Sequence, residues 1–418
     1  MIRRVIWAMS FCPLVSTYHD KGVFYVRKRI LSVVCLMLFV VSIAAMYLSV
    51  PDSLILYKDR SWSQSSIARL KVFDKSVETA KNAIVPRKEG DYEASLSIFG
   101  IPYKAVRVKV LEDDEVIVGG QAIGIRLYSD NLIVVAVGRV NEEGESPAQR
   151  AGIKEGDVIL SLNGEKVGSA EEFSEKIAMC EGAATLETQR EGDVREVTVT
   201  PEASRLDGKK RIGLWVRDST AGVGTLTYMD EETMTYGALG HGVSDADTGV
   251  KFSVKNGSVE ECSVAEIKKG EKGVPGELKG AFLKDAKVIG DITKNEKEGV
   301  FGRLSEVPGG ERVPLGHKSE IKKGVAFIRT SLDGKEAEDY EIEITKVSKG
   351  SKNPTKGLMI KVTDQRLIDK TGGIVQGMSG SPILQEGRLI GAVTHVLVND
   401  PTKGYGIFIE NMICASES

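Results

Sequence analysis

The stretch Gly377-Met378-Ser379-Gly380-Ser381-Pro382 decides how this sequence is interpreted, because it places Ser379 among glycines just before an apolar strand. A nucleophilic serine needs a tight turn that exposes its Oγ and leaves neighbouring N–H groups free to bind a developing oxyanion. Glycine permits such a turn because it has no Cβ. Ser379 is therefore a candidate nucleophile, and the N–H groups of Gly377 and Ser379 are candidate oxyanion-hole donors. A plain turn between two strands is the alternative.

Length and composition indicate a globular, mainly β protein with more than one domain. The chain has 418 residues, 45 glycines and 6% aromatic residues, and its short β-branched runs are typical of strands joined by tight turns. The net charge is -3, but residues 1–29 hold six basic side chains and one acidic side chain, a local charge of +5. The remainder is therefore acidic, which gives no reason to expect binding to nucleic acid.

Residues 30–50 form an apolar run of 21 residues without a charged side chain. A helix of this length can cross a bilayer. Three basic residues precede the run, so we expect residues 1–29 to stay in the cytoplasm and the body to be exported. We expect an uncleaved transmembrane anchor in the cell membrane. A signal peptide cleaved near Ser42-Ile43-Ala44 is the alternative, although signal peptides usually have shorter apolar segments.

Residues 51–110 are mixed and weakly periodic, and we expect a juxtamembrane linker followed by leading strands. A helix is expected in part of this region, around Ser63 to Ala83. The cysteines that follow the apolar run, Cys180, Cys262 and Cys414, have no spacing typical of a metal site or a disulfide framework. We expect them to be small core residues. No cofactor and no metal ion are expected.

Residues 111–202 resemble a PDZ domain. The segments that carry the resemblance follow in order: a glycine-rich turn and strand at 119–127, a strand at 131–137, a Ser-Pro-Ala turn at 146–148, a strand at 156–159, a helix at 171–180 and a closing strand at 194–200. Ile123, Gly124 and Ile125 stand where PDZ domains bind a peptide carboxylate and add a peptide strand. Ala122 replaces the usual first glycine. We expect peptide binding here; a module that only packs against its neighbour is the alternative.

Residues 203–418 contain many short strands separated by turns, which is typical of a β-barrel or sandwich. A serine nucleophile needs a base. His241 is the best candidate, because the glycines on both sides of it allow close approach and free orientation. His317 lies in a charged turn, where a solvated histidine is expected. His395 lies in an apolar strand, where a hydrogen-bonded core position is expected.

The base in turn needs a carboxylate that fixes its tautomer. Asp364 continues the inward-facing alternation of the apolar strand 358–362. An inward carboxylate is costly unless it has a partner, and an imidazole would supply one. Asp364 is therefore the candidate acid. Asp245 and Asp247 are rivals near His241, and a role in shaping turns is the alternative for all three.

The Ser379 motif resembles that of chymotrypsin-like serine peptidases. Together with the preceding PDZ-like unit, the segment Gly237-Ala238-Leu239-Gly240-His241 and the segment 371–382, it makes the whole chain resemble the stage IV sporulation protein B (SpoIVB-type) serine peptidases. The resemblance implies a chymotrypsin-like double β-barrel in residues 203–418, with His241, Asp364 and Ser379 as the catalytic triad. Met378 stands where chymotrypsin-like enzymes commonly have an acid, so activation by a buried new N-terminus is not expected.

The resemblance also implies a function in sporulation signalling. An enzyme of this type is exported from the forespore, cleaves itself and cleaves a membrane-bound regulator of an intramembrane protease, which leads to sigma-factor activation. Two other classes stay open. One is a PDZ-based binding scaffold with an inactive peptidase half. The other is an HtrA-type quality-control peptidase, although that type usually has its PDZ domain after the peptidase.

Overall fold

The computed structural model describes residues 33–38, 41, 53–63, 68–74, 77–80, 83–98, 100–111, 115–142, 144–281, 286–332 and 336–417. They divide into two compact units, one ending at Glu112 and the other beginning at Asp113. Most of the expected anchor, residues 30–50, lies outside the described residues. Within the described ranges, no helix combines the length and the apolar character needed to cross a bilayer.

The first unit is a small β structure, so the expected helix around Ser63 to Ala83 is wrong. The described strands of this unit form two sheets: β1 (Ser53–Tyr57), β7 (Ile101–Leu111), β6 (Gly90–Ile98) and β3 (Ala68–Val72) in one, and β2 (Trp62–Ser63), β5 (Ala83–Pro86) and β4 (Val77–Ala80) in the other. The period of two along β7 buries Val106, Val108 and Val110, because alternate side chains of a strand share one face.

The second unit has three parts, which we name by their location. The inserted lobe, residues 131–217, contains α2 (Pro147–Arg150), β10 (Val158–Leu162), β11 (Glu165–Lys166), α3 (Ala170–Met179), β12 (Ala184–Arg190), β13 (Asp193–Val199), β14 (Glu202–Ala203) and β15 (Lys210–Arg211). Its core is built from α3 and the lobe strands, with Leu132, Phe173 and Leu186 buried. The lobe therefore has a hydrophobic core of its own, separate from the cores of the other two parts.

The His241 sheet is the second part. It contains β8 (Glu115–Val118), the first half of β9 (Ala122–Val137), the second half of β16 (Leu214–Asp230), β17 (Thr235–Ala238), β18 (Asn256–Glu261), β21 (Val288–Asp291), β22 (Lys294–Glu296), β23 (Gly299–Arg303) and β24 (Arg312–Pro314). The hairpin β19 (Ser263–Lys268) and β20 (Glu277–Ala281) follows β18. The barrel-like sheet encloses its own core around Leu127, Tyr236 and Phe252.

The Ser379 barrel is the third part. Its strands close in the order β25 (Gly324–Thr330), β26 (Glu338–Val347), β27 (Leu358–Val362), β30 (Asp400–Phe408), β29 (Arg388–Leu397) and β28 (Pro382–Gln385). Alternation buries Ile342, Ile344 and Ile360 inside the barrel, which is what closure of a small barrel requires. The short helix α4 (Gln365–Thr371) leads into the Ser379 loop, and α5 (Ile409–Glu417) ends the chain.

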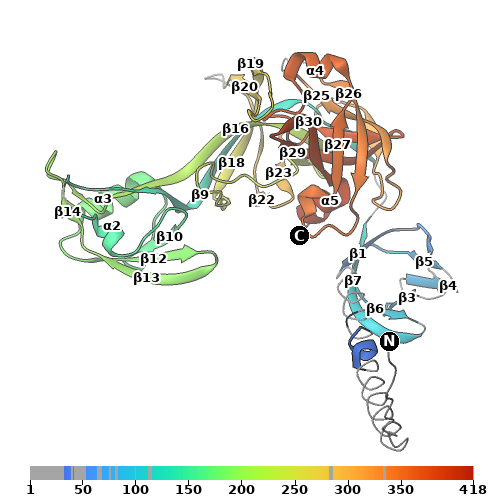
Figure 1. Cartoon of the computed structure of the whole chain (residues 1–418), viewed down its shortest axis with the longest axis horizontal. Helices are drawn as coiled ribbons and strands as arrows, with labels where there is room; N and C mark the ends of the chain where they lie inside the picture. The colour runs from blue at the N-terminus through green and yellow to red at the C-terminus, as the bar shows by residue number, and fades with distance from the viewer. Residues whose placement is uncertain are drawn as a thin grey trace, which may run out of the picture. The chain divides into compact units, whose positions relative to one another are not determined.

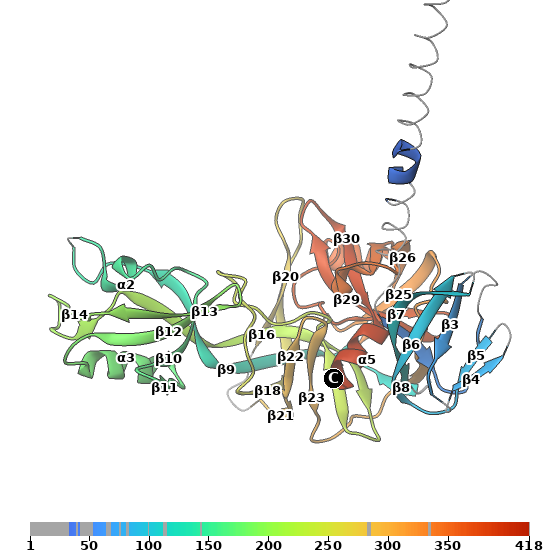
Figure 2. The ribbon, with the colours of Figure 1, turned by 90° about the horizontal axis from the view of Figure 1, so that it is seen from below.

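Two long strands, β9 and β16, connect the inserted lobe to the His241 sheet (Figures 1 and 2). They pair antiparallel from Ala122↔Thr225 to Val137↔Leu214, with two register shifts on the way. One end of this ladder therefore belongs to the lobe and the other to the sheet. The PDZ-like boundaries of 111 and 202 need correction for this reason: residues 115–128 lie in the His241 sheet, and Leu214 and Val216 pack against the lobe core.

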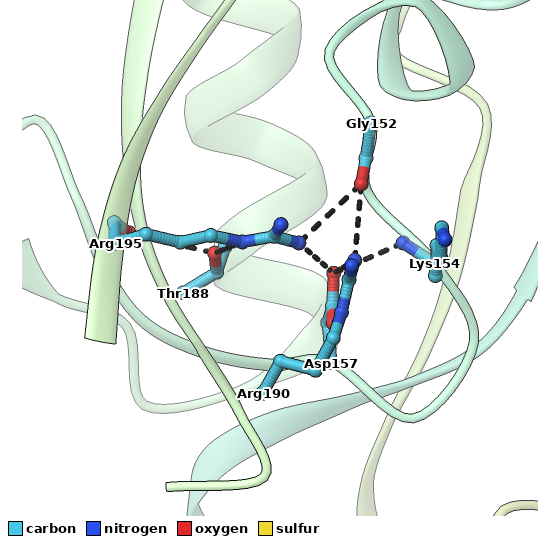
Figure 3. A network of polar contacts seen from close by, with 6 residues as sticks. All are labelled: Gly152, Lys154, Asp157, Thr188, Arg190 and Arg195. Carbon is cyan, nitrogen blue, oxygen red and sulfur yellow. Dashed lines mark hydrogen bonds and ion pairs between the residues drawn. The ribbon is translucent and has the colours of Figure 1, made fainter. Parts of the chain in front are cut away.

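A buried carboxylate fixes the turn of the inserted lobe between α2 and β10. The Asp157 side chain is fully buried and accepts hydrogen bonds from Arg190, Arg195 and the Lys154 amide (Figure 3). Burial by itself opposes ionisation, but the hydrogen bonds from Arg190 and the Lys154 amide outweigh it, so the pKa of Asp157 is lowered. Arg190 and Arg195 also donate to the Gly152 carbonyl, which ties the turn to β12 and β13.

Candidate active site

The Ser379 loop is held against β16 by three hydrogen bonds. The Thr225 N–H donates to the Ser379 carbonyl at 2.9 Å, and the Thr225 Oγ1 donates to the Gly377 carbonyl at 2.8 Å. The Thr227 Oγ1 donates to the Gly380 carbonyl at 2.8 Å. Gly380 has φ +96°, and a Cβ there would lie 2.1 Å from the Thr225 carbonyl oxygen. The glycine of the motif is therefore required by close contact with β16.

The hydroxyl of Ser379 is half-buried and donates to the Thr394 carbonyl at 3.0 Å. The carbonyls of Gly377 and Ser379 are both engaged by Thr225. By contrast, no hydrogen bond within the described residues uses the N–H of either Gly377 or Ser379. Gly377 has φ +96°. The loop thus leaves available the two donors that the sequence analysis selected.

His241 follows β17 on a turn with two residues of positive φ, Leu239 and Gly240. Its Nδ1 lies 2.9 Å from the Gly242 carbonyl oxygen. A carbonyl can only accept, so Nδ1 carries the proton and Nε2 is left as the basic nitrogen. Burial lowers the pKa of His241, and the Gly242 hydrogen bond partly offsets this effect. The imidazole is therefore neutral and able to accept a proton at pH 7.

His241 and Ser379 line one cavity of about 400 Å³. The histidine comes from the His241 sheet and the serine from the Ser379 barrel, so the cavity lies where these two parts meet. Strand β16 supplies a third side through residues 220–223. The structure therefore brings together the nucleophile and the base that the sequence predicted, from positions 138 residues apart in the chain.

Asp364 is not brought to the imidazole. It is the N-cap of α4, where its Oδ1 accepts from the Arg366 amide at 2.9 Å and its Oδ2 accepts from the Arg366 guanidinium at 2.8 Å. The hydrogen bond from Arg366 lowers the pKa of Asp364. No hydrogen bond joins Asp364 to His241, and Asp364 does not line the cavity. The expected tautomer-fixing contact is made by the Gly242 carbonyl instead.

The two rival acids are also engaged elsewhere. Asp245 is buried, pairs with Arg217 and accepts from the amide and hydroxyl of Thr248. Asp247 pairs with Arg217 at 3.0 Å. These contacts shape the turn after His241, which was the alternative interpretation of both carboxylates. Neither has a hydrogen bond to the imidazole.

His395 is a cavity residue that the sequence analysis did not select. It lies on β29, is exposed, and lines the same cavity as His241. The two imidazole rings are 5.4 Å apart between centroids. Desolvation of the ring is the largest cause that lowers the pKa of His395 to about 4, followed by the repulsion that a protonated His241 and the Lys356 ammonium would exert on its charged form. The apolar pattern of β29 suggested a core residue, because sequence alone does not tell a barrel rim from a barrel interior.

The expected carboxylate-binding loop, Ile123-Gly124-Ile125, is wrong. These residues form the first half of β9, where Ile123 and Ile125 are buried. Both edges of the segment are occupied, one by β16 at residues 222–224 and the other by β18 at residues 259–261. A strand paired on both sides cannot add a peptide strand.

A different segment of the inserted lobe has a left-handed glycine before a strand and a helix beside it, features that such a loop needs. Ile212-Gly213-Leu214 leads into β16 beside α3, and Gly213 has φ +81°. A Cβ on Gly213 would lie 2.3 Å from the Gly138 carbonyl oxygen. The ends of α3 are tied next to this segment, because the Ala170 amide donates to Asp218 and Lys210 donates to the Cys180 carbonyl. The Ile-Gly-Leu pattern followed by a strand was the signal available in the sequence.

The cysteines partly follow the expectation. Cys262 is buried, whereas Cys180 and Cys414 are half-buried, and all three are free thiols. Within the described ranges, no cluster of three His, Cys, Asp or Glu side chains could hold a metal ion.

Comparison with known proteins identifies two regions. The family model of the SpoIVB peptidase S55 matches residues 208–413, and a PDZ domain model matches residues 139–190. The first match contains His241 and Ser379, and the second lies within the inserted lobe. The expected PDZ domain is thus confirmed, with its matched region beginning later than residue 111.

Two curated relatives match a smaller part of the chain. A putative zinc metalloprotease of Clostridium acetobutylicum is 28% identical over 124 residues, which cover 29% of this chain and 33% of the relative. The zinc metalloprotease RasP of Geobacillus kaustophilus is 29% identical over 152 residues, which cover 29% of this chain and 35% of the relative. The chain therefore spans about a third of the length of these relatives. The present sequence has no His-Glu-x-x-His zinc motif.

Solved structures also match, with low overall similarity in the following example. The PDZ domain of an SdrC-like protein from Listeria monocytogenes is 19% identical, and the match covers 21% of this chain and 87% of that chain with a TM-score of 0.18.

Proposed function

The chain belongs to the SpoIVB peptidase S55 family of serine peptidases, and from this premise we propose that it is a membrane-anchored, exported endopeptidase of sporulation signalling. We propose that it cleaves itself and a membrane-bound regulator of an intramembrane protease. The observation that carries the proposed chemistry is the shared cavity of His241 and Ser379. An intact nucleophile and base in one cavity also favour an enzyme over a binding scaffold.

The proposed reaction is hydrolysis of a peptide bond through an acyl-enzyme. The Ser379 Oγ attacks the carbonyl carbon of the substrate, and the His241 Nε2 accepts the hydroxyl proton. The hydroxyl donates to the Thr394 carbonyl and must first exchange this acceptor for the imidazole. His241 then gives the proton to the leaving amine, and a water molecule, activated in the same way, releases the acyl group.

The oxyanion of each tetrahedral intermediate is assigned to the N–H groups of Gly377 and Ser379. Both lack a hydrogen-bond partner within the described residues, and both lie on a loop held by β16. Preorganised donors of this kind contribute about 3 kcal/mol each to transition-state stabilisation. No metal or cofactor is needed for these steps.

We propose that a backbone carbonyl takes the role that a carboxylate has in the usual catalytic triad. The Gly242 carbonyl fixes the His241 tautomer, because it accepts the Nδ1 proton at 2.9 Å. Asp364 acts indirectly in this proposal: it caps α4, the helix that leads into the Ser379 loop. The substitutions Asp364→Asn and Asp364→Ala distinguish this role from that of a triad acid.

Location and partners are proposed from the sequence and the family. The apolar run at residues 30–50, with basic residues before it, supports an anchor with the body on the exported side. A phosphatase reporter fused after Ser418, active only outside the cytoplasm, tests this topology. A cytoplasmic reporter that is active at the same position would overturn it.

The proposed activity is tested with the full-length chain in detergent. Wild-type protein is incubated alone and with the Ser379→Ala chain as substrate, and the products are identified by mass spectrometry. We expect cleavage of both chains by the wild type and none by Ser379→Ala or His241→Ala, with unchanged circular dichroism spectra. Cleavage that persists in Ser379→Ala would remove the serine-peptidase mechanism.

A further inference from the structure

We propose that the free edge of β16 is a continuous binding track for an extended peptide, which joins the PDZ domain to the active site. The occupant is a substrate segment that ends in a free C-terminal carboxylate. The carboxyl end lies at the Ile212-Gly213-Leu214 loop, and the scissile bond lies at Ser379. The enzyme would therefore cleave at a set distance from a chain end. This inference rests on the proposed peptidase function and extends it.

The edge is free over the length that the track needs. One edge of β16 pairs with β9 along the ladder described above. The other edge pairs with β17 at residues 226–230, whereas β8 continues the β9 edge at residues 228–229. Between Leu214 and Gly224, no strand within the described residues pairs with that second edge. Ala221 is exposed and Val216 is half-buried, so solvent reaches this stretch.

The edge leads directly to the nucleophile. The Thr225 N–H donates to the Ser379 carbonyl, and the Thr225 carbonyl accepts from the Leu239 N–H, so both backbone groups of Thr225 point away from β9. Backbone groups of an antiparallel strand alternate in direction from one residue to the next. Val223 and Ala221 therefore present their N–H and C=O groups to this free edge. Both residues also line the cavity of Ser379.

The same argument applies in the PDZ domain. The Gly213 carbonyl accepts from Gly138 of the β9 side, so the backbone groups of the next residue, Leu214, point to the free edge. Val216 is paired with Val134, whose N–H is turned to Asp157 and away from β16. Val216 therefore also points to the free edge. One register shift lies between Leu214 and Val216 and a second between Arg217 and Ser219, and the outward direction is recovered at Ala221 after both.

Charge sets the direction of the peptide. Lys209, Lys210 and Arg211 precede Gly213, at the end of the track that is far from Ser379. Arg211 pairs with Asp207 and Lys210 donates to the Cys180 carbonyl, so the exposed Lys209 is the cation that can meet the carboxylate of a peptide. A carboxylate is favoured there, and it would also meet backbone N–H groups in the loop. A peptide with its C-terminus at Gly213 and its scissile bond at Ser379 runs antiparallel to β16, so an outward residue of β16 can exchange both backbone hydrogen bonds with one residue of the peptide.

The length of the track gives a number that can be measured. Leu214 and Thr225 are 11 positions apart on β16. Paired antiparallel strands rise by about 3.3 Å per residue, so the peptide needs a similar number of residues over the same length. The scissile bond is therefore expected about 10 to 12 residues before the free C-terminus.

The test uses the full-length chain and a peptide pool of defined origin. Carboxymethylated bovine serum albumin is digested with chymotrypsin, the chymotrypsin is removed, and the pool is incubated with wild-type or Ser379→Ala protein. Mass spectrometry then gives the distance from each Ser379-dependent cut to the peptide's C-terminus. We expect these distances to cluster.

A cleaved peptide is next resynthesised with a free carboxylate, with a C-terminal amide and with six added Gly-Ser residues. The amide and the extended form should each lose about tenfold in kcat/KM at the original bond, a factor of ten corresponding to about 1.4 kcal/mol.

A matched pair of variants tests the edge itself. Val216→Pro removes one outward N–H and keeps the hydrogen bonds to β9, whereas Val216→Ala removes side-chain contacts and keeps that N–H. We expect the clustering of cut positions to disappear in Val216→Pro and to remain in Val216→Ala, with thermal unfolding confirming that both are folded.

Ser379-dependent cuts scattered without relation to the C-terminus in wild type would overturn the track and leave the peptidase function intact. An absence of any Ser379-dependent cut would count against the peptidase function itself. Should Val216→Pro convert a dimer into a monomer without moving the cuts, the edge pairs two copies of the chain and the track is wrong.

Discussion

The Thr225 backbone N–H donates to the Ser379 carbonyl oxygen across 2.9 Å, and the Thr225 Oγ1 donates to the Gly377 carbonyl across 2.8 Å. One residue of β16 thus holds the carbonyl of the nucleophile and the carbonyl of the residue two positions before it. This arrangement turns the carbonyls toward β16 and leaves the N–H groups of Gly377 and Ser379 available to the substrate. The position of the PDZ-connecting strand and the geometry of the oxyanion hole are therefore coupled through Thr225.

Thr225→Val tests this coupling. The substitution keeps the shape of the side chain but leaves the buried Gly377 carbonyl without a donor, which costs about 1 to 3 kcal/mol. We expect kcat to fall by about tenfold or more while KM changes little, because the loop is needed in the transition state. Thr225→Ser keeps the hydroxyl and serves as the control, with activity near the wild-type level. Equal activity of the valine and serine variants would contradict the coupling.

Asp364→Asn and Asp364→Ala distinguish a cap from a catalytic acid. Asn is as good an N-cap as Asp, whereas Ala removes the cap and costs about 1 kcal/mol of stability. We therefore expect Asp364→Asn to keep kcat/KM within about tenfold of wild type, and Asp364→Ala to lower the free energy of unfolding. If Asp364 were the triad acid, Asp364→Asn would lose about 10⁴-fold in kcat with unchanged stability. That result would return Asp364 to the position that the sequence suggested.

The pH dependence of the reaction reports the state of His241. A general base must be neutral, and burial lowers the pKa of His241 below its usual value of 6.5. The acid limb of kcat/KM is therefore expected to have its midpoint below pH 6.5, with activity lost as the pH falls through it. His395, with a pKa of about 4, is neutral in this range. His395→Gln should accordingly leave the midpoint where it is; a midpoint above pH 6.5 in wild type would argue against a desolvated imidazole.

Asp157 is expected to stabilise the PDZ domain. Its side chain is fully buried between Arg190 and Arg195, so Asp157→Asn should cost about 3 kcal/mol in the free energy of unfolding, measured with urea. The folded pKa of Asp157 is lowered, so this stabilisation is present above the unfolded pKa and is lost as the pH falls through the folded pKa. Asp207→Asn, which breaks the exposed pair with Arg211, is the control and should change little. Equal effects of the two substitutions would contradict the importance of burial.

Short-range signals predicted the fold class and the two central residues of the site. Ser379 and His241 each stand among glycines that their turns require, and local geometry of this kind is written in a few consecutive residues. The mainly β character also followed from local patterns. The PDZ domain was predicted for the same reason, since its segments appear in order along the chain.

The errors concern pairing between distant segments. Ile123-Gly124-Ile125 looked like an open loop, but its two edges are covered by β16 and β18. Both of these strands lie far from it along the chain. Asp364 looked like an inward carboxylate, yet Arg366, two residues later, takes it as a partner at the start of α4. For Asp364 the hydrophobic alternation was correct and the expected partner was wrong; for Ile123-Gly124-Ile125 a Gly-rich turn before a strand suggested an open edge, which strands distant in sequence cover.

The central claim is that Ser379 is the activated nucleophile of this enzyme. The most direct measurement is labelling of the full-length chain with a fluorophosphonate, followed by mass spectrometry of the adduct. We predict a single adduct on Ser379 that is retained in Ser381→Ala, strongly reduced in His241→Ala and absent in Ser379→Ala. An adduct on another residue, or labelling that does not depend on His241, would contradict the account.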